Sequence, residues 1–199
     1  MPHATNGRTA TLHRRELVAR MLAERGDMLV ISGLGNPSWD LAAAGDSDLN
    51  FYDLGAMGSA AALGLGLALA QPSRRVLVIT GDGELLMGIG TLATITGPRP
   101  KNLAIAVLDN EAYGETGLQP THTAHGVDLA AIALASGFPI AQTARDEAEF
   151  TAALPLLRNA PGPVLVVLKI VAEKLKIVSP PRDAAYVKSR FRKALLGMP

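Results

Sequence analysis

Two side chains with oxygen atoms, Asp82 and Asn110, stand close behind apolar stretches of this sequence. Asp82 lies between Gly81 and Gly83, which let the backbone turn tightly and approach a ligand. A helix expected to begin near Glu84 would direct free N–H groups at an anion such as a phosphate. A carboxylate repels a phosphate unless a cation lies between them, and Mg²⁺ binds carboxylates together with phosphate oxygens. The pattern therefore predicts a site for Mg²⁺ and a phosphate group.

Alternating apolar and helical stretches indicate the elements that position these residues. The expected strands are 28–32, 50–54, 75–80, 103–108, 139–143 and 164–171. The expected helices are about 11–25, 37–43, 57–69, 84–96, 128–136, 146–158 and 183–196. This alternation is typical of βαβ units, and nearly continuous apolar strands favour a sheet covered on both faces. We expect the α/β class, with three layers (α/β/α) and a mostly parallel six-stranded sheet, whose carboxyl edge brings Asp82 and Asn110 together.

The composition narrows the possible functions. With 199 residues, 48% of them apolar, the chain is expected to form one domain over 1–199. A formal charge of +1 without a basic run before the last twenty or so residues argues against nucleic acid as a partner. The absence of cysteine excludes disulfides and thiolate metal sites and fits a cytoplasmic location. The uncharged stretch 56–70 is interrupted by glycines and is shorter than the roughly 20 residues that span a bilayer, so no membrane is expected as a partner.

The spacing of the two oxygen-bearing residues resembles the signature of thiamine-diphosphate enzymes. Gly-Asp-Gly follows one apolar strand, and Asn110, 28 positions after Asp82, closes the next. The resemblance implies that Asp82, the side-chain oxygen of Asn110 and the backbone carbonyl of Ala112 bind Mg²⁺. It also implies that backbone N–H groups of Gly83 and Glu84 bind the diphosphate. Many members have two asparagines where this chain has Asp109-Asn110, a departure that leaves the expected ligand in place.

Two upstream turns extend this resemblance, which implies a thiamine-diphosphate-binding fold. In 54–59, the Gly55 carbonyl would accept a hydrogen bond from the aminopyrimidine ring, and Met57 would wedge between the two rings of the cofactor. In 32–41, the Asn36 amide or the Ser38 hydroxyl would add diphosphate contacts. Equally, Asn36 with the proline that follows it would simply cap a helix. The remaining expected cofactor contacts are Gly81 and Tyr113.

Over roughly residues 25–170 the chain resembles the β subunits of sulfopyruvate decarboxylases and the C-terminal part of phosphonopyruvate decarboxylases. The stretches 117–121 and 127–133 carry this resemblance. It implies a diphosphate-binding subunit of a heteromeric decarboxylase that acts on a small 2-oxo acid. Those enzymes often have Ser-Arg-Glu-Leu where this chain has 38–41, Ser-Trp-Asp-Leu. Loss of that arginine removes a partner for a sulfonate or phosphonate group.

The loop 110–127 is the one long connection between expected elements, and ordered loops of this length are usually functional. It presents Glu115, Gln119, His122 and His125 as candidates for catalysis. Histidine titrates near neutral pH, so His122 or His125 would protonate an intermediate or bind a carboxylate. A histidine on a solvent-facing loop without a direct role is the alternative.

The resemblance also implies a partner chain. The family's activating glutamate comes from a second, pyrimidine-binding domain, which does not fit in 199 residues. We therefore expect a separate pyrimidine-binding α subunit, and a hetero-oligomer with at least two copies of each chain. Two other hypotheses are a carboligase subunit similar to acetolactate synthase, using the same cofactor, and a non-catalytic nucleotide-binding module. Gly-x-x-x-x-Gly-Lys-Ser/Thr and Gly-x-Gly-x-x-Gly are absent from the strand-to-helix turns, which disfavours the module.

Overall fold

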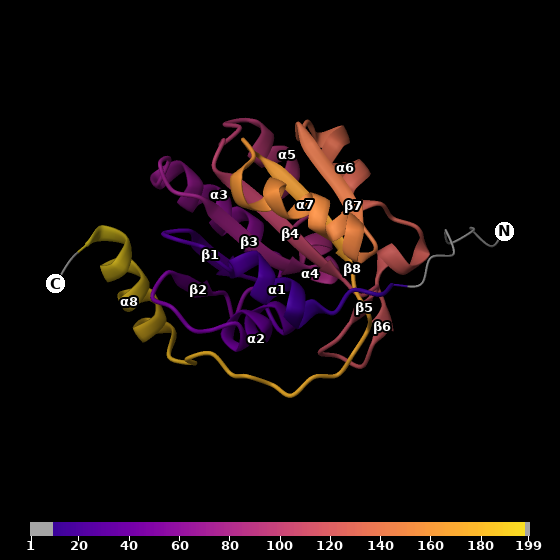
Figure 1. The fold of residues 1–199 in the computed structure, drawn as a ribbon, viewed down its shortest axis with the longest axis horizontal. Coiled ribbons are helices and arrows are strands. Elements are labelled where there is room, and N and C mark those ends of the chain that lie inside the picture. The colour runs from indigo at the N-terminus through magenta and orange to yellow at the C-terminus, as the bar shows by residue number, and fades with distance from the viewer. Residues whose placement is uncertain (1–9, 198–199) are drawn as a thin grey trace.

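The computed structural model describes residues 10–197, and its centre is a six-stranded sheet in which every strand pair is parallel (Figure 1). In spatial order the strands are β2 (Asn50–Tyr52), β1 (Leu29–Ser32), β3 (Val76–Gly81), β4 (Leu103–Asp109), β8 (Val164–Lys169) and β7 (Ile140–Ala144). All six strands expected from the sequence are present, and each strand end lies within two residues of the expected position. The three central strands β3, β4 and β8 are buried almost throughout, because helices cover both faces.

Helices form a layer on each face of the sheet (Figure 1). One layer contains α1 (Arg14–Leu22), α2 (Asn36–Ala43) and α7 (Glu147–Asn159), and the other contains α3 (Ala60–Ala70), α4 (Asp82–Met87), α5 (Thr91–Thr96) and α6 (Leu129–Ser136). The last helix, α8 (Ala184–Leu196), packs beside edge strand β2, where the rings of Phe191 and Phe51 meet edge to face at 5.6 Å. The expected α/β/α class is confirmed. None of the helices in the described part of the chain has the length and apolar character that a bilayer crossing requires.

Two segments differ from the sequence-based expectation. The single helix expected over 84–96 is two short helices, α4 and α5, because the chain bends at Gly88-Ile89-Gly90. The connection 110–127 contains a two-stranded hairpin, β5 (Ala112–Tyr113) and β6 (Gln119–Pro120), followed by the 3-10 helix η1 (His122–His125). Both differences place backbone close to the carboxyl edge of the sheet, where the candidate site lies.

A buried ion pair fixes α2 against α1. The side chains of Arg14 and Asp40 are almost inaccessible and contact each other, and Arg15 Nε donates to Asp40 Oδ1 at 3.1 Å. Burial raises the pKa of Asp40, and the two arginines oppose that rise. Because the first residue of α2, Asn36, lines the pocket described below, this pair also helps to position one wall of the site.

We expect Asp40→Ala to lower the free energy of unfolding by about 3–5 kcal/mol, because the substitution leaves a buried arginine without its partner. Urea denaturation would measure the change. The exposed pair of Arg20 and Glu147 supplies the matched control. Glu147→Ala is expected to change stability by less than about 1 kcal/mol. Equal effects of the two substitutions would contradict a special role for the buried pair.

Candidate cofactor site

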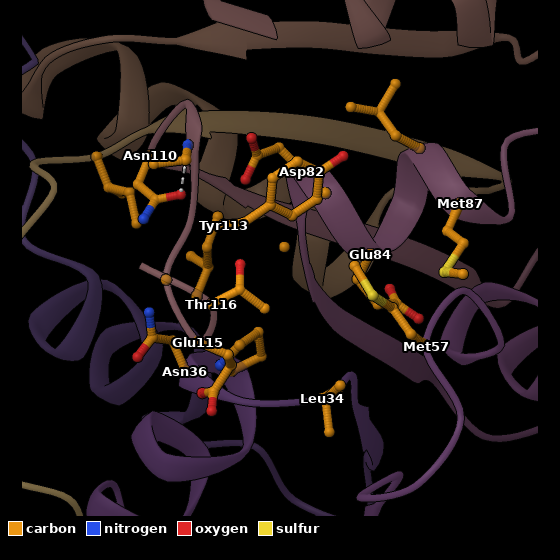
Figure 2. Close-up of a pocket in the computed structure, with 18 of the residues that line it drawn as sticks. Leu34, Asn36, Met57, Asp82, Glu84, Met87, Asn110, Tyr113, Glu115 and Thr116 are labelled. Atoms are coloured by element: carbon orange, nitrogen blue, oxygen red, sulfur yellow. Dashed lines mark hydrogen bonds between the residues drawn. The ribbon is translucent and has the colours of Figure 1, made fainter. Parts of the chain in front are cut away.

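A pocket of about 470 Å³ opens at the carboxyl edge of the sheet (Figure 2). Its walls come from the loops after β1, β3 and β4 and from the turn that precedes α3. Eleven of the residues expected from the sequence line it: Asn36, Met57, Gly81, Asp82, Gly83, Glu84, Asn110, Ala112, Tyr113, Glu115 and His122. Segments that are far apart in the sequence therefore meet in one cavity.

Asp82 is buried at the start of α4 and is bound by two threonine hydroxyls. Its Oδ2 atom accepts hydrogen bonds from Thr121 and, at 3.1 Å, from Thr123. Thr123 Oγ1 also lies 2.8 Å from Asp109 Oδ1, and Lys169 Nζ lies 2.7 Å from Asp109 Oδ2. Lys169 thus balances the charge of Asp109, whereas no basic side chain among residues 10–197 forms an ion pair with Asp82.

The electrostatics around Asp82 suit a bound cation. Burial and, to a smaller extent, the charge of Asp109 raise the pKa of Asp82 to about 6. A carboxylate held in this environment without a counter-charge is stabilised by a divalent cation, which favours its ionised form. The side chains present therefore fit Mg²⁺. Within 10–197 no three His, Asp or Glu side chains group as metal ligands, and the donor set expected here has one carboxylate, one amide oxygen and one backbone carbonyl.

The loop after β4 brings the other two expected donors to the same pocket. Asn110 Oδ1 accepts a hydrogen bond from the Ala112 N–H at 3.2 Å, which closes a small turn around Glu111. Glu111 has a positive φ of 60°, so the chain reverses sharply there. The amide oxygen of Asn110 has a second lone pair that remains available to a ligand.

Tyr113 covers the glycine turn at the start of α4. A Cβ atom added to Gly83 would lie 2.4 Å from Tyr113 Cε1, so only glycine fits beneath this ring. Further along the same hairpin, Figure 2 shows Glu115 beside Asn36. A Cβ atom on Gly35 would lie 2.7 Å from Glu115 Oε1, which indicates how closely the hairpin approaches the loop after β1. The hairpin thus forms one wall of the cavity.

Met57 lies on the turn between β2 and α3 and is 38% exposed. In Figure 2 its side chain lies beside Glu84 and near Met87. Glu84 is buried, and its Oε1 atom accepts hydrogen bonds from the Gly58 N–H at 3.0 Å and the Ala60 N–H at 3.1 Å. Burial raises the pKa of Glu84, and these backbone N–H groups oppose the rise. The Met57 turn is therefore attached directly to α4.

Four expected site residues do not line the pocket: Gly55, Ser38, Gln119 and His125. Ser38 is buried, and its hydroxyl donates to the Gly33 carbonyl at 2.8 Å, so it stabilises the loop after β1 from within. Gln119 bonds to Thr116 inside the hairpin. His125 is exposed on η1, whereas His122 lies at the pocket.

The structure brings several residues to the site that no sequence motif marks. The apolar lining includes Leu34, Leu86, Met87, Leu108 and Ile170. Thr121 and Thr123 contact Asp82 across 39 and 41 positions. No local periodicity marks such residues, because a threonine in a loop shows no sign of the carboxylate it will meet. The only available signal was the position of Thr121 in the stretch shared with the decarboxylases.

The chain is similar to known proteins over most of its length. Residues 40–168 match the family model described as thiamine pyrophosphate enzyme, C-terminal TPP binding domain. Sulfopyruvate decarboxylase subunit beta of Methanothermobacter thermautotrophicus is 40% identical over 94% of this chain and 97% of that protein. Phosphonopyruvate decarboxylase of Streptomyces viridochromogenes is 40% identical over 96% of this chain, which spans 48% of that enzyme.

One solved structure shows the same fold at lower identity. It is described as a thiamin diphosphate-dependent enzyme from Mycobacterium smegmatis and superposes with a TM-score of 0.69 at 23% identity. The match covers 86% of this chain and 34% of that one. The family match over most of the chain, and the extent of similarity to a complete β subunit, lead to one conclusion. This chain belongs to the thiamine pyrophosphate enzyme family and carries its C-terminal TPP-binding domain.

Proposed function

We propose that this chain is the diphosphate- and magnesium-binding β subunit of a heteromeric thiamine-diphosphate-dependent decarboxylase that acts on a small 2-oxo acid. The observation that carries the proposal is the convergence of Asp82, Asn110 and the Met57 turn on one pocket. Similarity to sulfopyruvate decarboxylase subunit beta over 97% of that protein supports the assignment to a separate subunit.

The proposed binding roles follow from the position of each group. Asp82, the Asn110 amide oxygen and the Ala112 carbonyl hold Mg²⁺, which in turn holds the diphosphate. Backbone N–H groups of Gly83 and Glu84 bind diphosphate oxygens, and Tyr113 shields this turn from water. When bound, thiamine diphosphate supplies the electron sink for loss of carbon dioxide from the 2-oxo acid. Met57 would wedge against the rings of the cofactor through its bulk.

His122 and Glu115 are the candidate substrate-facing groups on this chain, since both line the pocket. His122 would donate a proton or a hydrogen bond to the substrate. The rest of the lining is largely apolar, which limits access of water. None of the described lining residues is a lysine or an arginine, so His122 is the one basic side chain that this lining offers to a sulfonate or phosphonate group. We therefore propose the reaction class of the relatives for this chain, but not their substrates.

The surface beside the pocket supports the need for a partner. Helix α3 contains no charged residue, yet Leu63 is 39% and Leu69 is 51% exposed. Met87, at the rim of the pocket, is 68% exposed. Exposed apolar side chains near a binding site are a feature of interaction surfaces. We propose that a pyrimidine-binding α subunit covers this surface and supplies the activating glutamate, in an assembly with at least two copies of each chain.

A product assay on the assembled complex tests the reaction class. Thiamine-diphosphate-dependent release of carbon dioxide from a small 2-oxo acid, with the corresponding aldehyde as product, is the expected result. The assay is repeated with an added aldehyde acceptor, because a carboligase would convert both substrates into one product. Binding of ATP or NAD without any binding of thiamine diphosphate would instead identify a nucleotide-binding module and overturn the proposal.

Met57 provides a test of the wedge role. We expect Met57→Leu to retain most of the activity of the assembled complex and Met57→Ala to lose at least about tenfold, because bulk and not sulfur is needed. Steady-state kinetics with varied thiamine diphosphate would measure both variants. Leu134→Ala is the control, since it removes an exposed apolar side chain on α6 that does not line the pocket. Full activity of Met57→Ala would show that the wedge role is wrong.

A further inference from the structure

The side chain of Glu84 is buried, and the diphosphate contact proposed for its backbone N–H does not explain that burial. It is only 6% exposed, although it belongs to a short helix at the rim of a pocket. Its carboxylate accepts hydrogen bonds from the Gly58 and Ala60 N–H groups, which lie 26 and 24 positions earlier in the chain. The side chain therefore links α4 to the turn that carries Met57.

These hydrogen bonds complete the N-terminus of α3. The first N–H groups of a helix have no partner within it, and a carboxylate placed there is favourable. Ser59, the N-cap residue of α3, makes no side-chain capping hydrogen bond, and its hydroxyl group faces the Asp53 carboxylate and the Ala56 carbonyl. Glu84 thus acts as the cap of α3 from another element. Loss of its side chain would leave buried N–H groups unsatisfied.

A second, independent contact holds the same turn against the other end of α4. A Cβ atom on Gly88 would lie 2.1 Å from the Gly58 carbonyl oxygen, so the two backbones touch directly. Gly58 has a φ of 93°, a conformation that favours glycine, and a Cβ atom there would lie 3.1 Å from the Gly88 N atom. The Met57 turn is therefore bound to α4 by a carboxylate near its start and by backbone packing at its end.

We propose that Glu84 is a positioning residue that sets the Met57 turn relative to the Asp82 turn. Helix α4 begins with Asp82 and has Glu84 as its third residue, so one rigid turn of helix joins the two contacts. The consequence is that the two ends of the cofactor are recognised at a fixed separation. This inference rests on the proposed function, because it assigns the pyrimidine end to the Met57 turn and the diphosphate end to Asp82.

The test compares two ligands on the assembled complex by calorimetry. Thiamine diphosphate with Mg²⁺ contacts both turns, whereas inorganic pyrophosphate with Mg²⁺ contacts only the Asp82 turn. Glu84→Ala is expected to weaken thiamine diphosphate binding by more than about tenfold, since two hydrogen bonds to a charged acceptor are lost. The same variant should bind pyrophosphate within about twofold of wild type. Glu84→Gln keeps an acceptor oxygen of the same reach, and it should restore most of the thiamine diphosphate affinity.

The outcomes separate this inference from the proposed function. Wild-type complex that does not bind thiamine diphosphate would overturn the proposed function. The positioning role would be overturned if the wild-type complex binds thiamine diphosphate and Glu84→Ala loses affinity equally for both ligands. It would also be overturned if Glu84→Ala loses affinity for neither ligand. If circular dichroism shows that the alanine variant does not fold, Glu84→Asp takes its place. Aspartate keeps the negative charge, but its side chain is shorter. The aspartate variant should show the same selective loss of thiamine diphosphate, and its unchanged affinity would equally overturn the role.

Discussion

Replacing Asp82 with alanine is expected to weaken binding of Mg²⁺ and thiamine diphosphate to the assembled enzyme by more than about 100-fold. The substitution removes both a proposed oxygen ligand and the negative charge that would balance the cation. Isothermal titration of the complex would measure the loss. The variant should still fold: burial raises the pKa of Asp82, so its ionised form near neutral pH lowers the stability of the metal-free chain rather than raising it.

Asn110→Ala should also weaken binding, because the amide oxygen is the second side-chain ligand that we propose for the metal. Asp27→Ala is a suitable control, since Asp27 is an exposed carboxylate outside the pocket. Binding unchanged by both Asp82→Ala and Asn110→Ala would contradict the metal assignment. A loss of affinity in Asp27→Ala of similar size would show that charge alone, and not ligation, was measured.

The purified chain alone is expected to be inactive, and addition of its pyrimidine-binding partner should raise turnover from background to the full rate. The roles that we propose for this chain serve the metal, the diphosphate and one side of the pyrimidine. The carboxylate of Glu84, which contacts the Met57 turn, is already bound to the N-terminus of α3. Assays of 2-oxo acid decarboxylation by this chain, by the partner and by their mixture would test the prediction. Substantial cofactor-dependent turnover by this chain alone would refute it.

A charge placed on α3 should prevent the partner subunit from restoring turnover. Leu63→Lys introduces an ammonium group into the exposed apolar face of α3, where a partner would have to bury it. Ala148→Lys, on an exposed position of α7 in the opposite layer, is the matched control and should assemble normally. Size-exclusion chromatography of the mixtures would report assembly independently of activity. Assembly of both variants to the same extent would exclude α3 as the partner surface.

The sequence predicts the framework of this molecule better than its cavity. Nearly continuous apolar strands define a covered parallel sheet, so the strands and the edge that carries Asp82 and Asn110 follow from local pattern. The break between α4 and α5 is different. Helical periodicity continues through 84–96, and the bend at Gly88 depends on a backbone contact with Gly58, which is distant in sequence.

The same distinction applies to the side chains of the site. Ser38 follows a glycine-rich turn at the carboxyl edge of the sheet, and that position suggested a contact with the diphosphate. Its hydroxyl instead satisfies the Gly33 carbonyl, a choice that only the folded loop determines. Conversely, the threonine hydroxyls that donate hydrogen bonds to Asp82 come from a segment beyond the hairpin. Neither strand of that hairpin exceeds two residues. Strands this short leave too little alternation for a pattern to be recognised.

The strand order explains why a cavity exists at this point of the edge. From β1 the chain leaves through α2 toward β2, whereas from β3 it leaves through α4 and α5 toward β4 in the opposite direction. Since α2 and α5 lie on opposite faces, the two departing loops diverge and leave a crevice between adjacent strands, a topological switch point. The crevice belongs to the connectivity of the chain and not to any one side chain. Substitutions in its lining should therefore change which molecule is accepted while leaving a binding cavity in the same place.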